Sequence, residues 1–187
     1  MSPPIPIDEG RLRFEFDAQW QSAVKWDDSL AYRKGIGLLP DTKAVDILCR
    51  SKGRCVLIEV KDFRGHRIEN KPRVASGELQ QEVALKVRDT LAGLLGAARL
   101  NADGGYWQPY AKALVSNDDV YVVLWLEEDL VPTVGPGTQE QRWKTRLSTL
   151  LNVLKQRLHW LTPNVLVTSV REAGRLPGVQ VSNLPHS

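Results

Sequence analysis

Hydrophobic and polar positions form strand-like runs in four parts of the chain. These runs cover residues 43–49, 55–63, 118–126 and 164–170, and turn residues bound them, as is typical of strands. Gly53 lies in the short loop between the first two runs, so we expect them to pair as an antiparallel hairpin. A further short strand is expected near Ile36–Leu39.

Helical periodicity is clearest in residues 78–100 and 139–161, where apolar residues recur every three or four positions. Phe16, Trp20 and Val24 also lie about one turn apart, which predicts a first helix over residues 14–26. Residues 64–77 are polar, basic and rich in turn residues, so they are interpreted as a surface loop. Residues 1–6 and 182–187 are expected to be loose ends.

Length and composition favour a single domain over residues 1–187, because 187 residues with 42% hydrophobic content suffice for one sizeable core. The start of the chain lacks the pattern of a secretory signal, and no run approaches the roughly 18 apolar residues of a membrane span. We therefore expect a soluble, cytoplasmic protein that does not enter a membrane.

The formal net charge of +3 is too small to identify a nucleic-acid-binding protein, but the charges are unevenly distributed. Residues 50–77 and 138–187 are basic, and residues 101–137 between them are acidic. The position of the charges is therefore more informative than their sum.

Cys49 and Cys55 flank the hairpin loop and could face each other across two strands. We favour a reduced, half-buried pair over a disulfide, because an intracellular setting disfavours disulfides. The three histidines are scattered along the chain, so no zinc-site spacing is present.

The strongest chemical signal is the set of charged residues inside the hairpin strands, namely Asp46, Glu59 and Lys61. Because strand side chains alternate between faces, Glu59 and Lys61 point the same way. An unpartnered charge in an apolar run is costly, so these residues predict a site. The alternative is that these residues form no site and belong to an exposed, amphipathic sheet face.

These residues and the expected order of elements resemble the PD-(D/E)XK nuclease superfamily. Its shared core runs α-β-β-β-α-β, with an Asp on one strand and an acidic-x-Lys triplet on the next. Asp46 and Glu59–Lys61 take the matching positions, and Val45 stands where the family name has proline. The resemblance implies an α/β, restriction-endonuclease-like core with a mixed central sheet flanked by helices. That core covers about residues 15–127, and residues 138–172 add a helix and a strand.

The resemblance implies metal-dependent hydrolysis of phosphodiester bonds in nucleic acid, with Asp46, Glu59 and Lys61 as catalytic residues. Mg²⁺ or Mn²⁺ would be held by the carboxylates of Asp46 and Glu59 and the backbone carbonyl of Val60. In the family an acidic residue of the first helix often adds to the metal site. Glu15 is the candidate here, and three other acids compete with it: Asp17, Asp27 and Asp28.

Basic residues near this motif are candidates for binding nucleic acid. Lys86, on the helix over residues 78–100, matches the position from which family members place a polar or basic residue beside the site. An exposed Glu82–Lys86 pair is the alternative. The predicted loop and its borders add four candidates for phosphate contacts: Arg64, Arg67, Lys71 and Arg73. The six tryptophans could stack on bases, although Trp20, Trp125 and Trp143 are at core-like positions.

Two other functions remain open from the sequence. The chain could be a non-catalytic module that binds nucleic acid or protein and retains the nuclease fold. It could also be a nuclease subunit that acts only within a larger defence or repair complex. DNA is favoured over RNA because most superfamily members cut DNA, and a homodimer or a partner protein is compatible with the sequence.

Overall fold

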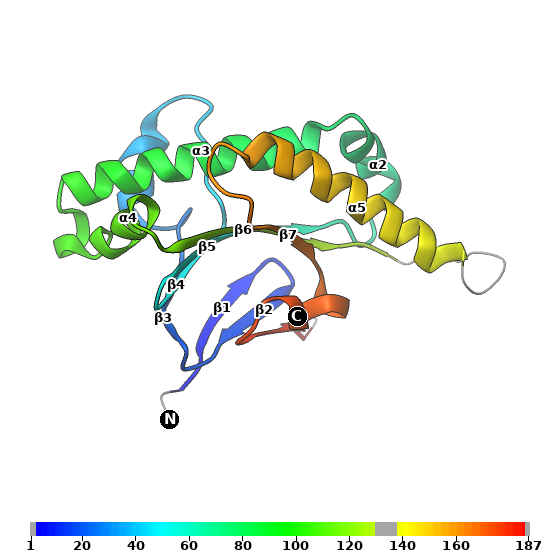
Figure 1. The fold of residues 1–187 in the computed structure, drawn as a ribbon, viewed down its shortest axis with the longest axis horizontal. Coiled ribbons are helices and arrows are strands. Elements are labelled where there is room, and N and C mark those ends of the chain that lie inside the picture. The colour runs from blue at the N-terminus through cyan, green and yellow to red at the C-terminus, as the bar shows by residue number, and fades with distance from the viewer. Residues whose placement is uncertain (1–2, 130–137, 186–187) are drawn as a thin grey trace.

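A five-stranded mixed sheet forms the centre of the molecule (Figure 1). The computed structural model describes residues 3–129 and 138–185. The sheet has the order β3-β4-β5-β6-β7, in which β3, β4 and β5 are antiparallel and β6 and β7 run parallel to β5. Its strands are β3 (Trp20–Lys25), β4 (Ile47–Ser51), β5 (Arg54–Asp62), β6 (Asp119–Glu127) and β7 (Val165–Thr168).

Helices cover one face of this sheet and a small antiparallel sheet covers the other, so the described chain has three layers (Figure 1). The helices are α1 (Leu30–Arg33), α2 (Arg67–Ala75), α3 (Glu78–Arg99), α4 (Gln108–Val115) and α5 (Thr138–Leu158). The small sheet has the order β1-β2-β8, with β1 (Ile5–Glu9), β2 (Leu12–Phe16) and β8 (Val179–Asn183). Three short 3₁₀ turns complete the elements: η1 (Ile36–Leu38), η2 (Ala102–Gly105) and η3 (Val170–Arg175).

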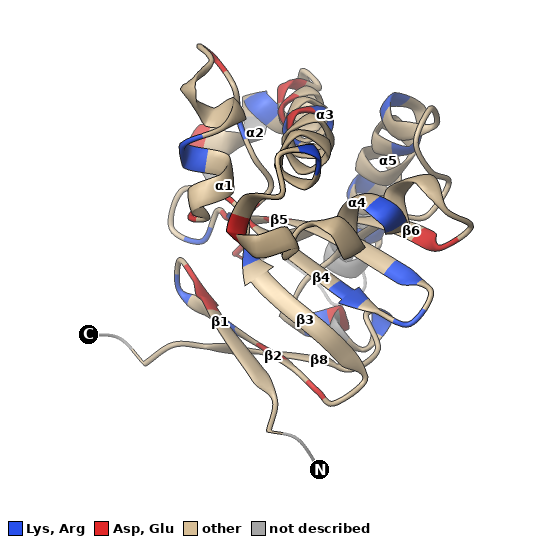
Figure 2. Cartoon of the chain, turned by 90° about the vertical axis from the view of Figure 1, so that its left-hand side faces the viewer, with Lys and Arg blue, Asp and Glu red and all other residues tan. Residues whose placement is uncertain are grey.

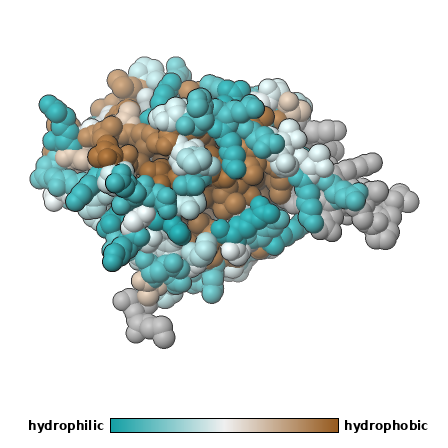
Figure 3. All heavy atoms as spheres, in the orientation of Figure 1, coloured by the Kyte–Doolittle hydropathy of each residue, from teal (hydrophilic) through white to brown (hydrophobic). Residues whose placement is uncertain are grey.

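Strand alternation explains why the central sheet has two buried faces. On β5, Leu57 packs into the core beneath the helices, whereas Val56 and Ile58 pack into the core shared with the small sheet. On α3, Leu79 and Val83 lie on the stripe that meets the sheet, and both are fully buried. On the face shown in Figure 3, hydrophobic side chains also reach the surface between hydrophilic ones.

The expected mixed α/β class is confirmed, with a mixed sheet flanked by helices on one face. The predicted hairpin, the helices over residues 78–100 and 139–161 and the two later strands are also present, with shifts of a few residues at their ends. Gly53 has a φ of 72° in the hairpin loop, a left-handed conformation that glycine adopts without strain.

The predicted first helix over residues 14–26 is wrong, because these residues form parts of β2 and β3. The buried residues of β2 alternate, with Phe14 and Phe16 inward. A turn follows in which Asp17 Oδ1 accepts a hydrogen bond from the Gln19 N–H at 3.0 Å. The helical spacing from Phe16 to Trp20 therefore spans a turn between two strands.

The expected strand near Ile36–Leu39 is the 3₁₀ turn η1, and most of the predicted loop over residues 64–77 is helix α2. Gly65 and Gly77 lie on either side of α2 with φ values of 80° and 82°. These glycines and Pro72, which lies inside the helix, produced the loop signal in the sequence. The glycines mark the ends of a helix and not a continuous loop.

Parts of the expected loose ends are strands, since β1 begins at Ile5 and β8 includes Ser182 and Asn183. Residues 1–2 and 186–187 lie outside the described residues. Both strands pair with β2 and thereby form the small sheet. The two cysteines are free, as expected, but they are fully buried and not half-buried. Cys49 pairs in register with Val56 and packs in the other core from Cys55, so the two thiols do not face each other.

Candidate functional site

The hairpin of β4 and β5 brings Asp46 and Glu59 together. Asp46 comes just before β4, and Ile47 is opposite Ile58 in the register. The Asp46 Oδ2 atom accepts a hydrogen bond of 2.6 Å from the Val60 N–H, which fixes this carboxylate against β5. Glu59 is fully buried and Asp46 is 7% exposed, so both acids are shielded from water.

Two lysine ammonium groups lie on the Glu59 carboxylate. Lys61 Nζ is 2.9 Å from Glu59 Oε1, and Lys86 Nζ is 2.7 Å from the same oxygen. Glu59 Oε1 is in ion-pair contact with both groups, although neither contact has the alignment of a hydrogen bond. Lys86, from α3, also lies 3.4 Å from Asp46 Oδ1 and donates to Glu59 Oε2 at 2.9 Å. Asp46 and Glu59 therefore share one cation, the Lys86 ammonium.

Burial and the nearby charge of Asp46 raise the pKa of the Glu59 carboxyl to about 7, even though Lys61 and Lys86 act in the opposite direction. Burial lowers the pKa of each lysine, but the charges and hydrogen bonds of the neighbouring carboxylates together outweigh it. Glu59 acts on both lysines, Glu82 on Lys61 and Asp46 on Lys86, so the pKa of each ammonium lies above its usual value. Both lysines are therefore charged at neutral pH, whereas Glu59 is near its midpoint.

Glu82 and Arg73 extend the cluster toward α2. Lys61 donates to Glu82 Oε1 at 2.9 Å, and Arg73 Nη2 donates to Glu82 Oε2 at 2.6 Å. Burial raises the pKa of Glu82, but the bond from Lys61 and the nearby positive charges outweigh it and lower the value overall. Figure 2 shows basic and acidic residues side by side on α2 and α3 above the sheet.

Asp27 is the acid that reaches this cluster from β3. It lies two residues after the end of β3, and its backbone neighbour Trp26 donates to the Asp46 carbonyl at 3.0 Å. Burial and the charges of Asp46 and Glu9 raise the pKa of Asp27 to about 6. Its Oδ1 atom is buried and has no hydrogen-bond partner in the described part of the chain.

Glu15, the candidate for an additional metal ligand, is not on a helix. It lies on β2 of the small sheet, opposite Pro6 and Gln180 in the register. Of the acids that competed with it, Asp17 is in the turn after β2, and Asp28 is exposed and pairs with Lys25 at 3.3 Å. Asp27 is electrostatically coupled to Asp46. The structure therefore shifts the candidate from Glu15 to Asp27.

The predicted basic residues whose side chains are described do not form one surface. Arg64 Nη2 pairs with Asp62 Oδ2 at 2.6 Å, and another Arg64 nitrogen donates to Asn183 of β8, so this side chain lies toward the small sheet. Arg73 is in the Glu82 cluster. Arg67 and Lys71 are on α2, but their side chains lie outside the described atoms. Among the three whose side chains are described, Lys86 is the one that directly contacts the Asp46 and Glu59 carboxylates.

The donor set suits a hard divalent cation, because two carboxylates already share one positive group and hard cations prefer oxygen ligands. The unpartnered oxygen of Asp27 adds a third acceptor nearby. Within residues 3–129 and 138–185, however, no three or more His, Cys, Asp and Glu side chains converge as a preformed metal site. A metal ion would therefore have to displace the ammonium of Lys86.

Glu82 is a member of the cluster that was not among the candidate site residues from the sequence. The available signal was its position one turn before Lys86 on the same helix face. That spacing suggested an exposed Glu82–Lys86 pair, whereas Glu82 pairs with Lys61 and Arg73 and Lys86 pairs with the strand acids.

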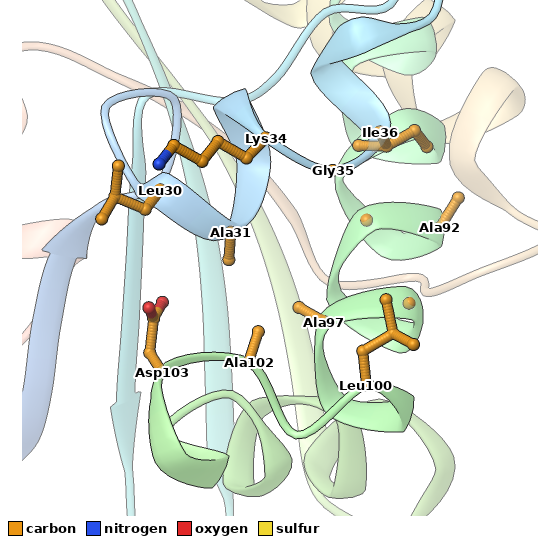
Figure 4. Close-up of a pocket in the computed structure, with 12 residues that line it drawn as sticks. Leu30, Ala31, Lys34, Gly35, Ile36, Ala92, Ala97, Leu100, Ala102 and Asp103 are labelled. Atoms are coloured by element: carbon orange, nitrogen blue, oxygen red, sulfur yellow. The ribbon is translucent and has the colours of Figure 1, made fainter.

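A hollow of about 530 Å³ lies farther along α3, between its C-terminal half, α1 and η1 (Figure 4). Its lining is mostly apolar and includes glycines of α3. Lys34 and Asp103 are the charged side chains among the residues that line it. The hollow therefore lacks the paired carboxylates of the Asp46–Glu59 cluster.

No family model, no curated protein sequence and no solved structure matches this chain. Among the described residues, the helices are too short or too polar to cross a membrane.

Proposed function

We propose that the chain is a metal-dependent nuclease of the PD-(D/E)XK type that hydrolyses phosphodiester bonds in nucleic acid, with DNA as the favoured substrate. The observation that carries the proposal is the sharing of one cation by Asp46 and Glu59, with Lys61 on the same Glu59 oxygen. This is the proximity that a carboxylate pair needs to hold one metal ion.

The order of elements supports the same proposal. Three antiparallel strands, β3 to β5, lead through α3 to β6, which is parallel to β5. This is the β-β-β-α-β part of the core to which the sequence motif belongs. The first element differs, because a β1-β2 hairpin precedes β3 where the family core has a helix.

Mg²⁺ or Mn²⁺ held by Asp46, Glu59 and the Val60 carbonyl, with Asp27 as a further candidate, would neutralise phosphate charge and acidify a bound water. Lys61 is charged in the state that the structure describes, so its ammonium is suited to orient water and stabilise negative charge on phosphate. Lys86, once separated from the carboxylates, would supply a second positive charge to the same phosphate.

The proposal is tested by incubating the purified protein with end-labelled single-stranded DNA, duplex DNA and RNA in Mg²⁺ or Mn²⁺. We expect cleavage that EDTA abolishes and that Lys61→Ala slows by about 100-fold or more. Lys52→Ala is the matched control, since Lys52 is exposed in the hairpin loop. Cleavage that is equally fast in Lys61→Ala would overturn the proposal.

A non-catalytic binding module is the second candidate, and one observation favours it. Both lysines are paired with the cluster carboxylates, so their charges already compensate those of the acids without a metal. Such a network can serve to stabilise a fold alone. Nucleic-acid binding that needs no metal, together with absent cleavage on all three substrates, would select this candidate.

A further inference from the structure

A second hollow is lined by residues of α3 other than those in the carboxylate cluster. It has a volume of about 480 Å³, within the usual range for small-ligand sites. Ala84 and Leu85 contribute its apolar lining, and the remaining lining residues are polar, charged or aromatic: Gln81, Arg88, Arg157 and Trp160. The hollow thus joins α3 to the C-terminal end of α5.

Trp160 differs from the other tryptophans whose side chains are described. Its side chain is 55% exposed, whereas Trp20, Trp26, Trp107 and Trp125 are each at most 3% exposed. An indole that is half exposed beside a hollow offers aromatic surface to a ligand. The sequence alone left open whether this residue packs in the core or stacks on a base.

The charged residues that line this hollow are both arginines. Arg157 donates a hydrogen bond to Gln81 Oε1, and Arg88 donates to Asp89 Oδ1 at 2.8 Å. Arg88 remains 62% exposed despite this pair, and no carboxylate of the described residues lines the hollow itself. Guanidinium groups bind phosphate well because they present several donors in one plane.

We propose that this hollow binds an unpaired nucleotide of a nucleic-acid strand. The base stacks on the Trp160 indole, and Arg157 and Arg88 contact the flanking phosphates. An aromatic face beside basic groups is the combination that single-stranded nucleic acids require, because every base can stack and every linkage is anionic.

The inference extends the proposed nuclease function, since it names a single-stranded segment as part of the substrate. Gln81 and Glu82 are neighbours on α3, but Gln81 faces the hollow and Glu82 binds Lys61. Arg157 Nη2 lies 3.7 Å from where a Cβ of Gly77 would be, beside the start of α3. A strand that crosses the start of α3 would therefore contact both the hollow and the carboxylate cluster.

The test is the anisotropy of a labelled oligothymidylate titrated with the full chain in EDTA, which prevents metal-dependent cleavage. We expect Trp160→Ala to weaken binding about tenfold to hundredfold, the effect of losing one stacked base. Trp160→Phe should retain most of the affinity, because phenylalanine keeps an aromatic face. Arg157→Gln should weaken binding and reduce its salt dependence, whereas Lys155→Gln, on the same helix but outside the hollow, should change neither.

Three results would overturn the inference: equal affinity of Trp160→Ala and the unchanged protein, equal losses in Trp160→Phe and Trp160→Ala, or no binding of the oligothymidylate at all. The cleavage assay tests the nuclease proposal separately from this binding test. Trp160-dependent binding without any cleavage would leave the inference standing and remove the nuclease proposal. Cleavage together with binding that does not depend on Trp160 would support the nuclease proposal and overturn the inference about the hollow.

Discussion

The negative charge of the Asp27 carboxylate is poorly stabilised in the folded protein. Its buried Oδ1 atom has no hydrogen-bond partner in the described residues, and burial together with Asp46 and Glu9 raises its pKa to about 6. The folded protein therefore binds this proton more tightly than the unfolded chain does. The contribution of Asp27 to stability falls as the pH rises from about 4 to about 6.

Asp27→Asn should raise the free energy of unfolding at pH 8 in metal-free buffer, because asparagine carries no charge. The expected gain is on the order of 1 kcal/mol, which allows for solvent screening of this half-exposed group, and it should disappear below about pH 4. Urea denaturation at both pH values measures it. Asp28→Asn is the control and should not stabilise, because Asp28 is exposed and paired with Lys25. A destabilised Asp27→Asn at pH 8 would contradict this account.

Glu82 positions Lys61. Replacing Glu82 should therefore lower the cleavage rate more than the affinity for nucleic acid. Glu82→Gln takes away one of the two carboxylates that raise the pKa of Lys61. We expect about a tenfold slower cleavage, with the alkaline limb of the pH–rate profile moved to lower pH. Glu78→Gln is the matched control, since Glu78 is 62% exposed and contacts Arg73 at 3.2 Å. An unchanged pH profile in Glu82→Gln would assign Glu82 a purely structural role.

Strand alternation sufficed to predict that Glu59 and Lys61 share a face, and the resemblance to the nuclease superfamily singled out Lys86. Asp27 was among the candidates, but Glu15 was preferred because a helix was expected over residues 14–26. The error arose from a helical spacing that spans the turn between two strands. The pairing of Lys61 with Glu82 depends on how α3 lies across the sheet, which the sequence of neither element specifies.

At the scale of elements, α3 approaches the sheet and η1 closely at one glycine. A Cβ on Gly93 would lie 2.8 Å from Ile36 Cγ2 and 2.9 Å from Trp26 Cζ2, whereas a Cβ on Gly96 would have nothing within 4 Å. The two positions are three residues apart on the same helix. Alanine substitutions at these two positions therefore separate the effect of helix propensity on stability from the effect of packing.

Gly93→Ala should lower the free energy of unfolding by about 1–3 kcal/mol through overpacking. Gly96→Ala should raise it by about 0.5–1 kcal/mol, because alanine favours the helix and meets no neighbour. Chemical denaturation of both variants measures the difference. Stabilisation by both substitutions would show that α3 is farther from Trp26 and Ile36 than the structure places it.

Long, strongly patterned elements were predictable, among them α3, β5 and β6. The sequence did not reveal β1 and β8, each of which is five residues long. β1 pairs with β2 in a local hairpin, whereas β8 becomes a strand by pairing with β2 across most of the chain. It also did not reveal α2, in which Pro72 lies inside the helix. Pairing between distant segments and a tolerated proline are properties of the tertiary structure.

At the scale of the whole molecule, the three layers depend on the two ends of the chain meeting in one small sheet. Val179 of β8 is 5% exposed and packs in the core between that sheet and the central one. Val179→Asp should therefore destabilise the protein by about 3 kcal/mol or more, since it buries an unpaired charge. Ser182→Asp, at an exposed position of the same strand, should have little effect on the thermal midpoint. Equal midpoints for the two variants would argue against the three-layer arrangement.

The nuclease proposal depends on whether Asp46 and Glu59 bind a divalent ion in place of the Lys86 ammonium. The pKa of Glu59 is about 7, so a proton competes with the ion at pH 6 but much less at pH 8. Binding should therefore strengthen as the pH rises over this interval. Asp62→Asn is a suitable control, because Asp62 is on the same strand but pairs with Arg11 and Arg64.

The most direct test is calorimetric titration of the protein with Mn²⁺ at pH 8. We expect saturable binding that is weaker at pH 6, lost in Asp46→Asn and Glu59→Gln, and retained in Asp62→Asn. The absence of binding by the unchanged protein, or equal binding by all four proteins, would contradict a metal site at Asp46 and Glu59.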